Sequence, residues 1–360
     1  MMIINKHNID ICDSLKIGSD IENNPLKIRI DKLTIVINLP KEKHKGNLYS
    51  RLKIIRNSKE SHYSIKFLKN KDETPFRYAL LVRLNNAFTP MILRIDYSPI
   101  NEKTGCIRFD FRPQHLSAEE MDGVFEWLRL HFGKKIMDEL MKKAWITQVD
   151  VAIDAYSRNL HDYIWHFFRA GKSDYYESKF SFPGIRIGSS RSVCHILCYE
   201  KIIKDKILKA NITNRKFIRV DIDSYKKFLR IEFRYRPNAK PSNKNSNHLL
   251  LQNILAMPNP LNRLSVYSKE LPLRLLSMGY ITKIPVEPTI LALLEDIKIN
   301  TKSQRISPKI KNIIEANKIN LFDSTLLWSK WEECVRRLGN HIFICQKDKD
   351  GEKFNKKSYP

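Results

Sequence analysis

The strongest constraint on the fold is a strict alternation of side chains in residues 147–156, TQVDVAIDAY. In a β-strand successive side chains point to opposite faces of the sheet, so the segment predicts a strand with one apolar and one polar face. The polar face carries Asp150 and Asp154. Two carboxylates beside an apolar core are costly unless they are paired or bind a cation.

Other β-branched or alternating segments predict further strands, at residues 27–39, 77–84, 91–97, 105–111, 180–187, 193–199 and 228–235. Residues 117–143 predict a long amphipathic helix, because Ser117 and Glu120 have capping-box spacing and apolar residues follow at helical period. Gly133 is a candidate break in it, and a second helix is expected at 160–170. The order of elements predicts an α+β fold, with an antiparallel sheet and helices packed on one face.

The composition changes after Pro237, where residues 239–247, AKPSNKNSN, predict a polar linker. Helices are expected beyond it at 249–257, 272–278, 289–297 and 321–338. The predicted organisation is a polar lead-in at 1–25, a main domain at 26–240, a smaller helical region at 241–345 and a charged tail at 346–360.

The charge points to a polyanionic partner, because 64 Lys and Arg against 39 Asp and Glu give a formal net charge of +25. Nucleic acid is the favoured partner, and the charge alone does not separate DNA from RNA or a ribosome. Binding to an anionic membrane surface or a lysine-rich codon bias would also give a basic chain. The six cysteines are scattered, which is typical of reduced thiols, and no apolar run approaches the length of a membrane span. We therefore expect a cytoplasmic protein without a membrane segment.

Residues 229–237, LRIEFRYRP, predict a second strand with a polar face, which carries Arg230, Glu232 and Arg234. Glu232 can be a metal ligand flanked by phosphate-binding arginines, or a member of a cross-strand ion pair. The same choice holds for Asp150 and Asp154. They can hold a hard cation, Mg²⁺ or Mn²⁺, or they can be surface carboxylates on the solvent side of the sheet.

A candidate nucleophile lies between these two strands, in the segment 185–206. Alternation puts Tyr199 on the same side as Lys201, and a phenol needs a nearby cation or base before it can attack phosphorus. A tyrosine packed in the core would give the same pattern. The basic run that follows includes Lys204 and Lys206 and is a candidate contact for the DNA backbone, or else a solvated helix face.

Five segments carry a family resemblance: IDKLTIVINL, RFDFRPQHL, TQVDVAID, IGSSRSVCHILCYEK and LRIEFRYR. Together they resemble the replication initiation factor (Rep_trans) family of plasmid rolling-circle initiators, phage initiators and relaxases. The resemblance spans about residues 30–237. It implies a metal-dependent endonuclease that nicks and closes one DNA strand at an origin through a 5′-phosphotyrosyl intermediate. It implies Tyr199 as the nucleophile, assisted by Lys201, and Asp150, Asp154 and Glu232 as ligands of Mg²⁺ or Mn²⁺. Arg230, Arg234, Lys204 and Lys206 are then the expected DNA contacts.

Three further tyrosines near these strands are alternative nucleophiles: Tyr156, Tyr175 and Tyr176. The competing hypotheses are a non-catalytic origin-binding initiator or repressor, and an RNA-binding protein that uses sheet-face aromatics. The expected partner is plasmid or phage origin DNA, with a host helicase and polymerase and a second copy of the chain as further candidates. The role of the helical region is left open between origin specificity, dimerisation and helicase recruitment.

Overall fold

The structure is a computed structural model. It describes residues 15–19, 25–39, 41–70, 74–85, 91–156, 158–178, 181–203, 227–237 and 249–342. No helix in this part of the chain is both long enough and apolar enough to cross a bilayer.

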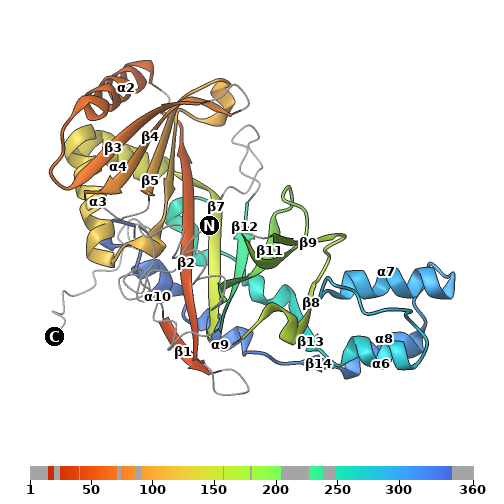
Figure 1. The fold of residues 1–360 in the computed structure, drawn as a ribbon. Helices are drawn as coiled ribbons and strands as arrows, with labels where there is room; N and C mark the ends of the chain where they lie inside the picture. The colour runs from red at the N-terminus through yellow and green to blue at the C-terminus, as the bar shows by residue number, and fades with distance from the viewer. Residues whose placement is uncertain are drawn as a thin grey trace. The chain divides into compact units, whose positions relative to one another are not determined.

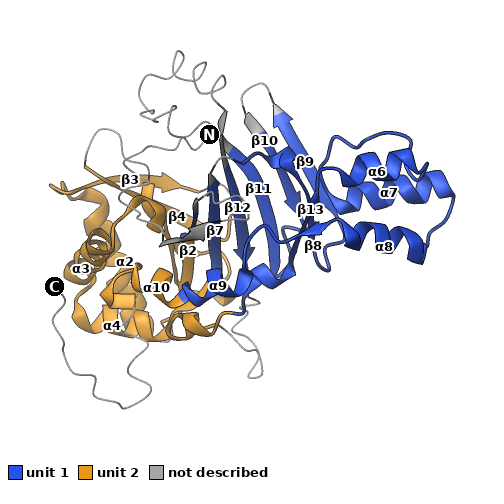
Figure 2. Ribbon diagram, turned by 90° about the horizontal axis from the view of Figure 1, so that it is seen from below, with its two compact units in different colours: residues 1–31, 148–236, 258–331 blue, residues 32–147, 237–257, 332–360 orange. Residues whose placement is uncertain are grey.

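The chain divides into two compact units, each assembled from three stretches of sequence (Figure 2). Unit 1 comprises residues 1–31, 148–236 and 258–331, and unit 2 comprises 32–147, 237–257 and 332–360. The sequence, in contrast, predicts domains in linear succession. The division into compact units does not show which residues are sufficient for activity. A functional domain at residues 26–240 therefore stays a prediction.

Unit 2 contains an antiparallel meander with helices on one side. Its strands pair in the order β3 (Tyr63–Lys69), β4 (Phe76–Leu84), β5 (Met91–Pro99), β6 (Ile107–Phe111) and the second half of β2 (Pro25–Ile37). The helices α2 (Glu42–Asn57), α3 (Ala118–Phe132) and α4 (Lys134–Lys143) gather on one side of these strands (Figure 2).

The predicted start and break of the long helix in unit 2 are confirmed. Ser117 accepts a hydrogen bond from the Glu120 backbone, and the Glu120 side chain accepts one from the Ser117 backbone. Gly133 has φ 79°, a conformation that favours glycine, and it separates α3 from α4. The short 3₁₀ turns η1 (Glu102–Thr104) and η2 (Pro113–His115) also belong to this unit.

Unit 1 is built around a second set of antiparallel strands. β1 (Leu15–Ser19) pairs with the first half of β2, and beyond β2 the order is β7 (Trp145–Tyr156), β12 (Lys227–Tyr235), β11 (Cys194–Ile203), β10 (Ser181–Ile187) and β9 (Ser173–Ser178). One face of the sheet has a buried apolar centre, with Val151, Ile153, Ile231, Phe233 and Ile196 at 0% exposure. The predicted α+β fold with an antiparallel sheet is confirmed.

The rest of unit 1 is a small helical part. A three-stranded sheet of β8 (Tyr163–Phe167), β13 (Leu264–Ser268) and β14 (Lys318–Ile319) lies beside α6 (Leu271–Ser277), α7 (Ile290–Thr301) and α8 (Pro308–Ala316) (Figure 1). Leu271, Leu275, Leu293, Ile297 and Ile310 are members of one buried cluster. The predicted helical C-terminal region is thereby confirmed, and α8 is an addition to the helices expected there.

The helix predicted at 160–170 is wrong. Residues Leu160–Asp162 form one 3₁₀ turn, η3, and the chain then continues as β8. Trp165 is fully buried, and its indole N–H donates to the Leu160 carbonyl at 2.9 Å. β8 is a strand because it pairs with β13, which lies about a hundred residues later, and single-segment periodicity cannot register such a distant partner.

Two other predicted helices are shorter or divided. The segment 249–257 contains the 3₁₀ turn η4 (Leu251–Ala256), and η5 (Pro260–Arg263) follows it. The segment 321–338 contains α9 (Ser324–Ser329) and α10 (Trp331–Arg336). The first of these two helices begins only at Ser324 because Asp323 is its N-cap and accepts hydrogen bonds from two backbone amides.

Candidate active site

The strand register of unit 1 arranges the polar face of the sheet in cross-strand rows. One row runs Asp154, Arg230, Tyr199, Gly184 and Tyr176 across β7, β12, β11, β10 and β9. The next row, two residues along each strand, runs Ala152, Glu232, Leu197, Arg186 and Asp174. Directly opposed residues share a face, so the sequence-predicted acids, arginines and tyrosine do lie together.

Tyr199 and Glu232 form the central contact of this face. The Tyr199 hydroxyl donates to Glu232 Oε2 at 2.8 Å, and Arg234 Nε donates to Glu232 Oε1 at 2.6 Å. Glu232 is 2% exposed, whereas the Arg234 side chain is 34% exposed. The Tyr199 phenol, the Glu232 carboxylate and the partly exposed Arg234 guanidinium are therefore joined by two consecutive hydrogen bonds.

The Tyr199 phenol is protonated at neutral pH in this arrangement. Burial, followed by the negative charge of Glu232, raises the pKa of Tyr199 well above its ordinary value near 10. Arg230 acts in the opposite direction but does not reverse the shift. A reaction at this phenol therefore needs a base to take its proton, and Glu232 is already hydrogen-bonded to that proton.

Arg230 is buried in a cluster with three other charged side chains of the described residues, Arg29, Asp31 and Asp154. Its Nε and Nη2 donate to Asp154 at 2.6 and 2.9 Å, and its Nη1 donates to Asp31 Oδ1 at 2.5 Å. The guanidinium of Arg29 also pairs with Asp154. Burial lowers the pKa of Arg230, but the charges of Asp154 and Asp31 outweigh it, so the net shift is upward.

Asp150 lies further along β7 and is 2% exposed. Both of its carboxylate oxygens accept from Gln148 Nε2, at 2.8 and 2.9 Å, and Arg234 Nε lies 3.7 Å from Asp150 Oδ2. Arg236 Nε in turn donates to Gln148 Oε1 at 3.1 Å. Arg234 therefore stands between two acids, Glu232 and Asp150.

The three predicted metal ligands do not fit one cation in this arrangement. Asp154 is paired with two guanidiniums, while Glu232 and Asp150 both contact Arg234. In the described part of the chain, no group of three or more His, Cys, Asp or Glu side chains is placed to hold a metal ion. The expectation of Mg²⁺ or Mn²⁺ stays a prediction.

The other predicted residues are less fully placed. Lys201 belongs to β11, beside a register irregularity between Glu200 and Ile202. Lys204 and Lys206 lie outside the described residues. The backbone of Tyr156 pairs with Phe228 at the end of β7.

The two neighbouring tyrosines of β9 differ from each other. Tyr175 is opposite Ile185 on the apolar side of the register, and its hydroxyl donates to Glu177 at 2.8 Å. Tyr176 shares the polar face with Tyr199 and is 40% exposed. No strand was expected at β9, because SDYYES does not alternate between apolar and polar residues, and only its two adjacent tyrosines favour a strand.

His195 is a site residue that the sequence reasoning missed. It is opposite Arg234 in the register and only 1% exposed. Within the described part of the chain its Nδ1 has no hydrogen-bond partner. Burial, followed by the charges of Arg236 and Arg234, lowers the pKa of His195 to about 4, so the imidazole is neutral at pH 7.

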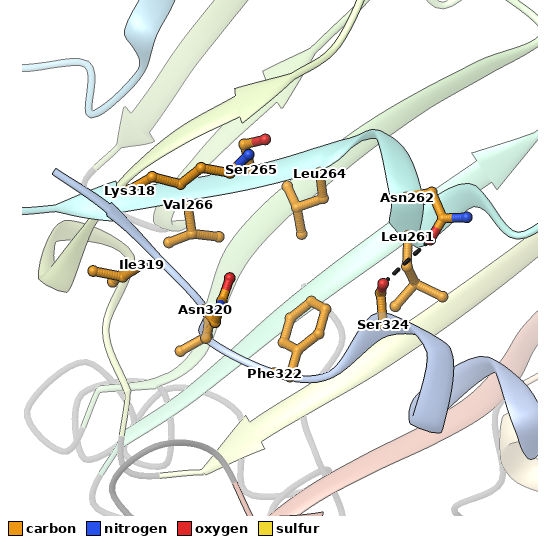
Figure 3. A pocket seen from close by; sticks show the side chains of 11 residues that line it. Leu261, Asn262, Leu264, Ser265, Val266, Lys318, Ile319, Asn320, Phe322 and Ser324 are labelled. Atoms are coloured by element: carbon orange, nitrogen blue, oxygen red, sulfur yellow. Dashed lines mark hydrogen bonds between the residues drawn. The ribbon is translucent and has the colours of Figure 1, made fainter. Parts of the chain in front are cut away.

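A pocket elsewhere in unit 1 contains none of the predicted site residues (Figure 3). It has a volume of about 320 Å³ and is lined by residues of η5, β13, β14 and the start of α9, among them Ser265, Lys318, Asn320 and Phe322. Ser324 Oγ donates to Asn262 Oδ1 at 3.2 Å across its rim. The pocket lacks the acid and phenol of the sheet face, so the candidate active site is the sheet face.

Comparisons with known proteins give a likeness in structure only. No family model matches the chain, and no curated protein matches it. Among solved structures, it is similar to a rolling circle replication initiator protein from Geobacillus stearothermophilus, with 15% sequence identity and a TM-score of 0.32. The match covers 62% of this chain and 92% of that protein. The function proposed below rests on the side chains of the sheet face.

Proposed function

We propose that this chain is a rolling-circle replication initiator that nicks and rejoins one DNA strand with Tyr199 as nucleophile. The observation that carries the proposal is the contact of the Tyr199 hydroxyl with Glu232, which also binds Arg234. A hydroxyl nucleophile, a base within hydrogen-bond reach and a cation beside the base are the components that activated nucleophiles need.

The reaction balances without an added co-reactant. Glu232 takes the phenol proton as the Tyr199 oxygen attacks the scissile phosphorus. The bond from phosphorus to the Tyr199 oxygen forms, the bond to the DNA 3′ oxygen breaks, and the Glu232 proton passes to the leaving 3′ oxygen. The products are a 5′-phosphotyrosyl link and a 3′-OH that a polymerase extends, and the reverse reaction rejoins the strand because the ester bond is conserved.

Arg234 is the candidate phosphate contact of this step. Its Nε donates to Glu232, and the partial exposure of its side chain supports a role for its terminal nitrogens in offsetting charge on the phosphate oxygens. Arg230 has a different role in the proposal. Because it is 2% exposed and bonded to Asp154 and Asp31, it supports the strands that hold Tyr199 rather than binding DNA.

The helices α7 and α8 supply a second basic surface in unit 1. Residues 298–318 contain six Lys or Arg and one acid, Glu315. Lys302, Arg305, Lys309 and Lys311 are exposed, and Ser307 caps α8 by accepting from the Ile310 amide. We propose that this surface binds the duplex backbone of the origin, since exposed Lys and Arg concentrated in one segment give the electrostatic footprint of a DNA-binding protein.

The test is formation of a covalent protein–DNA link. The protein is incubated with supercoiled DNA that carries its own gene and flanks, in Mg²⁺, in Mn²⁺ or in EDTA, and DNA-bound protein is counted after SDS. We expect an adduct that Tyr199→Phe abolishes and that Tyr175→Phe, on the opposite face, retains. Mass spectrometry of the trypsinised adduct then identifies the tyrosine that carries the nucleotide. Loss of the adduct in EDTA would support the predicted metal requirement.

A non-catalytic origin-binding initiator or repressor is the second candidate. The observation that favours it is the ion cluster of Arg29, Asp31, Asp154 and Arg230, in which the carboxylates are structural. Tight binding to the supercoiled DNA without a covalent product in any of the three conditions would establish this candidate and refute the nickase.

A further inference from the structure

Tyr176 presents an aromatic ring on the same polar face as Tyr199. In the register, Gly184 of β10 lies opposite both tyrosines, with Tyr199 on one side and Tyr176 on the other. Tyr176 is 40% exposed, whereas Tyr199 is only partly exposed. The proposed chemistry does not use Tyr176, because Glu232 accepts its hydrogen bond from Tyr199.

Gly184 leaves open the space that the outer end of the Tyr176 ring occupies. A Cβ at position 184 would lie 2.4 to 2.6 Å from the Cζ, hydroxyl and Cε2 atoms of Tyr176, distances that real Cβ atoms do not show. The Tyr176 ring therefore occupies the space that any other side chain at 184 would fill. The outer end of the Tyr176 side chain therefore lies over the backbone of β10, and 40% of the residue is exposed to solvent.

The neighbours of the ring fit a nucleic-acid strand. Arg186 is two residues from Gly184 on the same face, and its side chain is 38% exposed although it pairs with Asp174 at 2.6 Å. Arg234, 34% exposed, lies on the same face two strands away from Arg186. An aromatic ring flanked by partly exposed arginines combines base stacking with phosphate contacts, as surfaces that bind single-stranded nucleic acid do.

We propose that Tyr176 is a stacking platform for a base of single-stranded DNA next to the scissile phosphate. Its place in the reaction rests on the proposed nicking function, but the binding itself does not require nicking. The ring positions the strand so that the phosphate lies over Tyr199 and Arg234, which makes Tyr176 a positioning residue. The hydroxyl of Tyr176 is not needed for this, because stacking uses the face of the ring.

The test compares two labelled oligomers of about 16 nucleotides, oligodeoxythymidine and a fully abasic strand of the same length. Fluorescence anisotropy gives Kd for the full-length protein. Tyr176→Ala is expected to weaken oligodeoxythymidine binding about 5- to 150-fold, the range measured for loss of one base stack. Tyr176→Phe is expected to bind within about twofold of wild type. Neither variant should change binding of the abasic strand, which retains the phosphates but has no bases.

Gly184→Ala provides an independent variant, because it keeps Tyr176 but displaces its ring, and we expect it to lose the same base-dependent affinity. Folding of each variant is checked by its circular dichroism and by unchanged duplex binding. The proposal is overturned if Tyr176→Ala binds oligodeoxythymidine as wild type does, if Tyr176→Phe is as weak as Tyr176→Ala, or if the abasic strand is weakened equally. Tighter binding of oligouridine than of the DNA would overturn the assignment to DNA. A chain that binds in the expected way but forms no adduct refutes only the nickase.

Discussion

Replacing Arg230 with methionine is expected to destabilise unit 1 more than any exposed arginine substitution on the same sheet face. Among the described residues, Arg29, Asp31, Asp154 and Arg230 form a cluster of two positive and two negative charges, and all four are at most 6% exposed. Removing one guanidinium leaves a buried excess negative charge, which costs about 3 to 5 kcal/mol. At about 2 to 4 °C per kcal/mol for a domain of this size, the melting temperature should fall by roughly 6 to 20 °C.

The matched control is Arg186→Met. Arg186 also pairs with an aspartate, Asp174 on the adjacent strand, but the two side chains are 38% and 46% exposed. A pair of this kind contributes about 0 to 1 kcal/mol, so its loss should lower the melting temperature by less than about 4 °C. A rescue variant, Arg230→Met with Asp31→Asn, restores charge balance and should recover much of the loss. Equal melting temperatures for Arg230→Met and Arg186→Met, measured by circular dichroism, would refute the reasoning.

Three further predictions concern the site and the basic surface. Because the pKa of His195 is lowered to about 4, the unfolded state binds a proton that the folded state does not between about pH 6.5 and 4, so stability rises with pH across this window. His195→Phe should remove up to about 1.4 kcal/mol per pH unit of that slope, measured by urea unfolding at several pH values. Lys309→Glu with Lys311→Glu should weaken duplex binding and reduce the salt slope by about 0.9 for each lost phosphate contact, measured by titration at several salt concentrations. Glu232→Gln should slow adduct formation about 10²- to 10⁴-fold in single-turnover assays, and an unchanged rate would exclude Glu232 as the base.

The sequence predicts the strands of the site better than it predicts their partners. The alternation in residues 147–156 and 229–237 correctly places Asp150 and Asp154 on one face of β7, and Glu232 with its arginines on one face of β12. The same pattern treats Arg230 and Arg234 as equivalent DNA contacts. Their exposures differ because Arg230 meets Asp31, which lies 199 residues away in sequence. No local pattern contains that pairing, so the burial of Arg230 follows only from the assembled register.

The missed elements have the same physical cause. β8 is a strand because it pairs with β13. The helix expected at 160–170 is wrong because the local sequence does not reveal this pairing. Tyr176 becomes a site residue only because β9 pairs with β10 in a register that puts Gly184 beneath its ring. In sequence, a glycine and a tyrosine eight positions apart carry no signal of contact. Local periodicity therefore determines the faces of the strands, and long-range pairing determines which faces meet.

The geometry of Arg234 explains how one residue can serve both the base and the phosphate. Its Nε donates to Glu232 and lies 3.7 Å from Asp150, so the inner edge of the guanidinium is held by two acids. A guanidinium is planar and has donors on two edges, whereas a lysine ammonium is a single point charge. The outer nitrogens of Arg234 can therefore bind a phosphate oxygen while the inner nitrogen keeps Glu232 aligned on Tyr199. In the proposed reaction, Glu232 takes the proton of the phenol and Arg234 contacts the phosphate from the same carboxylate, so the proposal couples phosphate binding to activation of the nucleophile through one side chain.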